Sequence, residues 1–163
     1  EGTSPKGESV MMELDTLEMV LRLVVALALG ALIGLNRRIY GKPAGLRTMA
    51  LVSLGSATFT IVGVNAMFQL ATVEQAAGIE AMVRLDTSRV IAGIVGGIGF
   101  LGAGAIIQSR GRVQGMTTAS GIWMTAAIGV ASGLGQYTLA LTATFLAFVV
   151  LVVLRRAIDD EEE

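Results

Sequence analysis

The sequence predicts an all-α membrane protein, a bundle of five transmembrane helices with its N-terminus outside and its C-terminus in the cytoplasm. Composition is the first support, because 53% of the 163 residues are hydrophobic and only 15% are charged. A soluble domain carries about 25% charged residues. The second is charge spacing: long uncharged runs alternate with short charged segments, and a helix crosses a bilayer with about 20 apolar residues. The third is that basic residues concentrate in alternate segments between these runs.

The uncharged runs define the helices in order. The first, Leu23 to Leu35, has 13 residues or about 20 Å of helix, so the span must extend back through Arg22 to cross a hydrocarbon core of about 30 Å. The last, Val113 to Leu154, has 42 residues and is divided by the turn sequence Gly133-Leu134-Gly135-Gln136. The predicted spans are 17–35, 48–70, 88–107, 117–132 and 137–154.

Basic residues set the predicted orientation, because short cytoplasmic loops are enriched in Lys and Arg. Eight of the twelve basic residues fall on one side when the five spans alternate; they are Arg37, Arg38, Lys42, Arg47, Arg110, Arg112, Arg155 and Arg156. The chain is expected to comprise a flexible tail (1–10), a transmembrane domain (11–156) and an acidic tail (157–163).

The composition excludes several classes of function. The chain has no Cys and no His, which removes thiolate nucleophiles, imidazole bases and the usual zinc and haem ligands. Its net charge of −1 gives no basic field for nucleic acid. We therefore expect no catalytic residues, metal site, cofactor or nucleic-acid partner, and no enzymatic activity.

Glycines within the spans indicate close helix packing, since membrane helices associate through small residues. The first span contains the GxxxG pair Gly30 and Gly34. The third contains a GxGxxG pattern, but no strand precedes it, so it does not indicate a dinucleotide site. We expect this span to be the central helix, and substitutions there to disrupt the fold more than Gly135→Ala. The expected packing glycines are Gly30, Gly34, Gly93, Gly97, Gly99, Gly102 and Gly104.

Arg22 is the most informative charged residue, because a charge within a span normally has a partner or a wet cavity. Glu18 precedes it by four residues, the favourable order for a helical ion pair. One interpretation is an outward polar site for a cation or a proton, formed by Asp15, Glu18, Arg22, Asp86 and Arg89. The other is that Arg22 extends its charge to the outer interface and fixes the span.

The second and fourth spans both begin on the predicted cytoplasmic side. If they are parallel neighbours, their N-terminal N–H groups and nearby cations could bind one anion or a lipid headgroup. The alternative is ordinary capping together with arginines that touch anionic lipid. The candidate residues are Arg47, Thr48, Arg110, Arg112, Thr117 and Thr118.

Two groups of motifs resemble the MgtC/SapB family. The first is Gly30-Ala31-Leu32-Ile33-Gly34 with Ala44-Gly45-Leu46-Arg47-Thr48. The second is 97–104 with Gly115-Met116-Thr117-Thr118-Ala119 and Trp123. The sequence differs from family patterns at Asn36, where an acidic residue is common, and at Thr117 and Met124, where virulence-associated members have Asn and Cys. Many members also carry a C-terminal domain of ACT type, which we do not expect here.

The resemblance implies a multi-pass protein of the bacterial inner membrane, linked to growth under magnesium limitation and, in pathogens, to survival in macrophages. It implies a regulatory mechanism through membrane partners such as the F-type ATP synthase. Expected partners are membrane lipid, another membrane protein, and further copies of the chain in a homodimer or higher oligomer. A small channel or carrier for an ion or polar solute is the alternative function.

Overall fold

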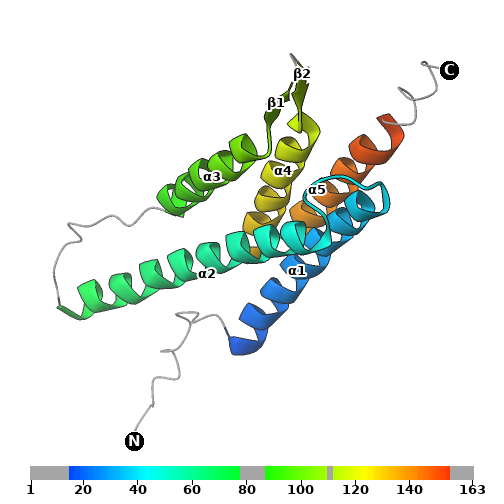
Figure 1. The fold of residues 1–163 in the computed structure, drawn as a ribbon. Helices are drawn as coiled ribbons and strands as arrows, with labels where there is room; N and C mark the ends of the chain where they lie inside the picture. The colour runs from blue at the N-terminus through cyan, green and yellow to red at the C-terminus, as the bar shows by residue number, and fades with distance from the viewer. Residues whose placement is uncertain (1–14, 78–86, 110–111, 155–163) are drawn as a thin grey trace, which may run out of the picture.

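A computed structural model describes residues 15–77, 87–109 and 112–154. The two predicted tails, 1–10 and 157–163, lie outside this part of the chain. Five α-helices are present in the described residues, and the last continues into a π-helical turn (Figure 1). The elements are α1 (Thr16–Ile39), α2 (Leu46–Ala77), α3 (Thr87–Gly104), β1 (Ile107–Ser109), β2 (Arg112–Gln114), α4 (Met116–Gly133), α5 (Tyr137–Val149) and η1 (Val150–Leu154).

Helices α1 and α2 form an antiparallel hairpin held together by the two glycines of the GxxxG motif. A Cβ atom added at Gly34 would lie 2.7 Å from Leu46 Cα, and one added at Gly30 would lie 2.7 Å from the carbonyl oxygen of Met49. Near the other end of the hairpin, the Asn65 side-chain amide lies 3.6 Å from Met19 Sδ. The backbones therefore approach too closely for any side chain at these glycines.

Helices α2 and α4 pack in parallel, also through glycines. Gly121 lies against the Met49 side chain. A Cβ atom at Gly129 would lie only 2.2 Å from the Ser53 carbonyl oxygen. Positions on both helices advance together along the contact, so the N-termini of α2 and α4 lie at the same end of the bundle. This is the arrangement that the proposed anion site requires.

The central helix is α4, and the expectation that the third span occupies the centre is wrong. Helix α4 contacts all four other α-helices, and Figure 1 shows it between α3 and α5. Only Gly102 of α3 is buried, and an added Cβ there would lie 3.7 Å from Ala119 Cβ. No atom of the described residues lies within 4 Å of a Cβ atom built at the other α3 glycines named above, which are Gly93, Gly97, Gly99 and Gly104.

Side-chain size is distributed as expected for a protein surrounded by lipid. Small residues such as Ala26, Ala57 and Ala140 are fully buried, whereas Phe59 and Phe100 are 65% and 82% exposed. A soluble protein rarely leaves so much apolar surface in contact with water. In a bilayer the same arrangement is favourable, because small residues allow helices to approach and large ones face lipid.

Four buried hydroxyl groups are satisfied within their own helices, whereas the buried hydroxyl oxygens of Ser53 and Tyr137 have no hydrogen-bond partner among the described residues. The Thr60, Thr125 and Thr144 hydroxyls each donate to the carbonyl oxygen four residues earlier, at 2.8 Å, and that of Ser132 does so at 2.9 Å. These bonds remove the cost of leaving a polar group unpaired in an apolar interior. The core can therefore use Ser and Thr as small packing residues.

A short antiparallel hairpin modifies the expected all-α architecture. Strands β1 and β2 pair Ile107 with Gln114 and Ser109 with Arg112, which shortens the third helix to Gly104. These strands are not predicted from the sequence, because three residues are too few to stand out in a sequence read for membrane spans of about 20 residues. Gly115 follows with φ of 90°, and a Cβ atom there would lie 2.0 Å from the Ala105 carbonyl oxygen. Glycine is required at this junction.

Three of the described helices are long and apolar enough to cross a membrane: Thr16–Ile39, Leu46–Gln69 and Thr87–Gly104. The apolar segment Tyr137–Val153 is shorter. The predicted break between the last two helices is confirmed, because α4 ends at Gly133 and α5 begins at Tyr137. The five-span topology and the orientation of the termini remain predictions.

The packing predicts a sharp contrast between two glycines. Gly129→Ala should destabilise the bundle by about 1–3 kcal/mol, because the new methyl group overlaps the α2 backbone at Ser53. Gly99→Ala is the matched control, since its methyl group enters open space. Melting temperatures of the purified variants in detergent measure the difference. Equal melting temperatures would contradict the α2–α4 contact.

Candidate functional site

Arg22 lies in the core of the bundle rather than at its surface. Its side chain is paired with Glu18, whose Oε1 accepts from Arg22 Nε at 3.2 Å and also from Nη2. Arg22 Nη1 donates to the Gly133 carbonyl oxygen at 2.8 Å. Only 8% of Arg22 is exposed. The expected i,i+4 ion pair is therefore present, and a second partner comes from the end of α4.

The second partner belongs to a helix C-terminus, which carries unpaired carbonyl groups and partial negative charge. The turn after α4 is closed by a bond from the Gln136 N–H to the Ala131 carbonyl oxygen at 2.9 Å, with Gly135 at φ of 74°. A Cβ atom at Gly135 would lie 2.8 Å from Arg22 Nη2. The expectation that Gly135→Ala is milder than changes at Gly97 or Gly99 is therefore wrong, because Arg22 fills the space beside Gly135.

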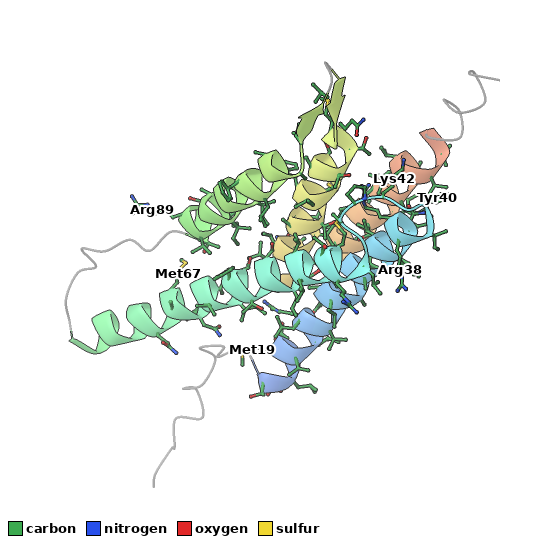
Figure 2. The ribbon with its side chains drawn as sticks, viewed as in Figure 1. Met19, Arg38, Tyr40, Lys42, Met67 and Arg89 are labelled. Atoms are coloured by element: carbon green, nitrogen blue, oxygen red, sulfur yellow. The ribbon has the colours of Figure 1, made fainter. Side chains whose placement is uncertain are left out.

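The remaining members of the outward polar site are not brought to Arg22. Asp15 is exposed at the start of α1 and caps no helix through its side chain. Arg89 is exposed at the start of α3, where Figure 2 shows it near Met67 and on the other side of α2 from Met19. Asp86 lies outside the described residues. Of the five residues, the structure joins only Glu18 and Arg22.

Arg37 is a second buried arginine on α1, and the sequence analysis assigned it to a loop. Its Nη2 donates to Thr118 Oγ1 at 2.6 Å and to the Pro43 carbonyl oxygen at 3.2 Å. Only 3% of the residue is exposed. These bonds connect the end of α1, the segment that follows it, and the first turn of α4.

The two arginines therefore hold opposite ends of the same helix. Arg22 binds the last residue of α4 and Arg37 binds its third residue, so α1 and α4 run antiparallel. A sequence signal for Arg37 existed. The buried positions of α1 form one stripe that begins at Arg22 and ends at Arg37, at spacings of three and four residues. They are Arg22, Ala26, Leu29, Gly30, Ile33, Gly34 and Arg37.

The residues of the predicted cytoplasmic anion site are divided between two places. Thr118 is buried and bonded to Arg37, whereas Thr117 beside it is exposed. Arg47 and Thr48 are exposed and line a groove between α2 and α3. Arg110 lies outside the described part of the chain, and for Arg112 the structure describes the strand but not the side chain. The parallel helix starts are present, but the structure shows no single anion pocket formed by all six residues.

The groove has a volume of about 750 Å³. Its walls are residues 47–59 of α2 and 90–101 of α3. Arg47, Thr48 and Ser56 are its polar residues, and the others that line it are apolar or glycine. Arg47 makes no hydrogen bond or ion pair within the described ranges. The open α3 glycines Gly93 and Gly97 face this groove, which explains why no side chain meets them.

The Arg22 contacts predict a stability effect. Arg22→Leu removes the charged partner of Glu18 and the donor to Gly133, so we expect the melting temperature to fall by several degrees while membrane insertion is retained. Arg89→Leu is the control, because Arg89 is exposed. An unchanged melting temperature for Arg22→Leu would indicate that Arg22 only extends its charge to the membrane interface. Its bond to the Gly133 carbonyl oxygen would then not stabilise the bundle.

The Arg37 contacts predict a difference between neighbouring arginines. Arg37→Leu should cost about 1–3 kcal/mol of stability, since Thr118 and the Pro43 carbonyl lose their donor. Arg38→Leu should change stability by less than about 0.5 kcal/mol, because Arg38 is exposed, as Figure 2 shows. Thermal unfolding of both variants in the same detergent tests the pair. A similar loss in both variants would mean that charge at this end of the bundle matters and the Arg37 contacts do not.

The family model described as "MgtC family" matches residues 23–159. Protein SrpB of Synechococcus elongatus is 40% identical over 87% of this chain and 78% of its own length. The putative magnesium transporter YhiD of Escherichia coli K12 is 39% identical over 85% of this chain, and Protein MgtC of Salmonella typhimurium 41% over the same share. The match spans 61% of YhiD and 53% of MgtC. No solved structure matches the chain. The chain belongs to the MgtC family.

Proposed function

We propose that this protein is a regulatory protein of the bacterial inner membrane that supports growth under magnesium limitation through contact with membrane partners. Family membership and the relatives named MgtC and YhiD support the link to magnesium. The regulatory role rests on one observation, which is that Arg22 and Arg37 form hydrogen bonds between helices of the bundle. Both guanidinium groups are bonded within the bundle, so they hold helices together and are not free ligands along a transport path.

The alternative is a small channel or carrier, which the name of YhiD, a putative magnesium transporter, favours. Magnesium sites use oxygen ligands, with carboxylates prominent among them. The groove between α2 and α3 is lined by Arg47 and by no carboxylate, and the described residues contain no cluster of three acidic side chains. A cationic group in an apolar groove repels a divalent cation, so the regulatory role is the better supported one.

The proposal includes a five-span topology with the N-terminus outside and the C-terminus in the cytoplasm. Helix α4 has 18 residues, or about 27 Å, and α5 with its π-helical turn has a similar length. Both lengths are close to a hydrocarbon core of about 30 Å. The proposed partners are the F-type ATP synthase, lipid and further copies of this chain. Survival of pathogens in macrophages would follow from the same regulatory role.

Growth and flux measured together test this function. In a bacterium that lacks its own MgtC-type protein, the wild-type chain should restore growth at limiting magnesium, whereas Arg37→Leu should not and Arg38→Leu should. The purified wild-type protein in proteoliposomes should produce no magnesium uptake above that of empty liposomes. Saturable uptake that Arg37→Leu abolishes would overturn the regulatory role in favour of the carrier.

The same strain tests the partner. Chemical cross-linking in the membrane should join the chain to a subunit of the F-type ATP synthase, and expression should lower ATP-driven proton pumping in inverted vesicles. Normal pumping without a cross-linked product would remove the synthase from the proposal, and the growth assay would still decide the link to magnesium.

A further inference from the structure

We propose that the groove between α2 and α3 is a binding site for one anionic phospholipid, with its phosphate at Arg47 and an acyl chain along the groove. The groove is polar at one end, and apart from the buried Ser56 the rest of its lining is apolar or glycine. Arg47 and Thr48 lie at the polar end, and the α2 wall continues through Leu51 and Val52 to Phe59. This distribution of polarity matches a headgroup followed by a hydrocarbon chain.

The length of the groove fits one leaflet of a bilayer. The α2 wall advances twelve residues from Arg47 to Phe59, which corresponds to about 18 Å of helix. One leaflet contributes about half of a hydrocarbon core of about 30 Å. A site that begins at the membrane surface and ends near the bilayer centre has the reach of an acyl chain.

The shape of the groove favours a flexible chain over another helix. Beyond Phe59 the walls meet, because a Cβ atom at Gly63 would lie 2.7 Å from a Val90 methyl carbon. Thr87 Oγ1 also lies 2.8 Å from Met67 Sδ, closer to the same end. A second helix has a uniform diameter of about 10 Å and would have to separate these contacts. An acyl chain is thinner and more flexible than a helix, so it can fit the groove up to the point where the walls meet.

The positive charge at the Arg47 end of the groove favours an anionic headgroup. Arg47 is exposed and has no ion-pair partner among the described residues, and Thr48 adds a hydroxyl donor beside it. Arg38 and Lys42 lie at the same end of the bundle, as Figure 2 shows, and both are exposed. A lipid phosphate at Arg47 would gain a charge-assisted hydrogen bond within a positive local field.

Native mass spectrometry of the purified full chain, with phosphatidylglycerol and phosphatidylcholine of identical acyl chains as probes, tests the site. The wild-type protein should retain phosphatidylglycerol with about fivefold higher affinity, the factor that one arginine near an anionic surface contributes. Arg47→Gln should remove this preference. Arg38→Gln is the matched control, because Arg38 is exposed at the same end but does not line the groove.

A second pair of variants tests the acyl chain. Gly97→Leu places a side chain in the groove and should reduce the binding of both lipids, whereas Gly99→Leu, on the same helix but outside the groove, should leave it unchanged. The comparison requires unchanged melting temperatures, and a Cβ atom built at either glycine has no described atom within 4 Å. Three results would each overturn the proposal: equal affinity for the two lipids, displacement of phosphatidylglycerol by glycerol phosphate at equal concentration, or a change of oligomeric state in Gly97→Leu with lipid binding intact.

Discussion

The antiparallel contact between α1 and α4 is the constraint on which the bundle depends. Two arginines on one stripe of α1 bind the two ends of α4, one at a backbone carbonyl of the last turn and one at Thr118 of the first. They lie fifteen residues apart, about 22 Å along the helix. These two bonds fix the position and direction of α4 along α1. Helix α2 then packs on both helices through glycines of α1 and α4, and the close approach at these glycines allows only one register.

Polar contacts can decide which helices pack together here, because helices in lipid lack the hydrophobic driving force that acts in water. Burial of apolar surface contributes little to helix association in a bilayer, so close packing and interhelical hydrogen bonds decide which helices meet. Ser53 shows the result, because Gly30 of α1 and Gly129 of α4 both lie against it. The Ser53 Cβ atom faces Gly30 and its backbone carbonyl faces Gly129, so a residue larger than serine at this position would push α1 away from α2.

Much of this fold can be predicted from the sequence, since uncharged runs and the turn at 133–136 define the five helices. The Glu18–Arg22 pair also follows from spacing alone. The centre of the bundle could not be predicted in this way, because a glycine permits close approach without specifying the neighbour. Arg37 was missed for a related reason: a basic residue at the end of a span is normally a loop residue, and only its place on the buried stripe of α1 distinguishes it from Arg38.

The peripheral position of α3 gives its glycines a different physical meaning from those of α1 and α4. In the core, glycines remove side chains so that backbones can touch, and any addition causes overlap. On α3, Gly93 and Gly97 leave space that no atom of the described residues fills, beside Arg47, which no described acidic residue neutralises. Space of this kind lowers the packing of α3 against the bundle and costs dispersion energy unless another molecule occupies it. At the proposed lipid site, an acyl chain in the groove would supply the contacts that Gly93 and Gly97 leave unmade.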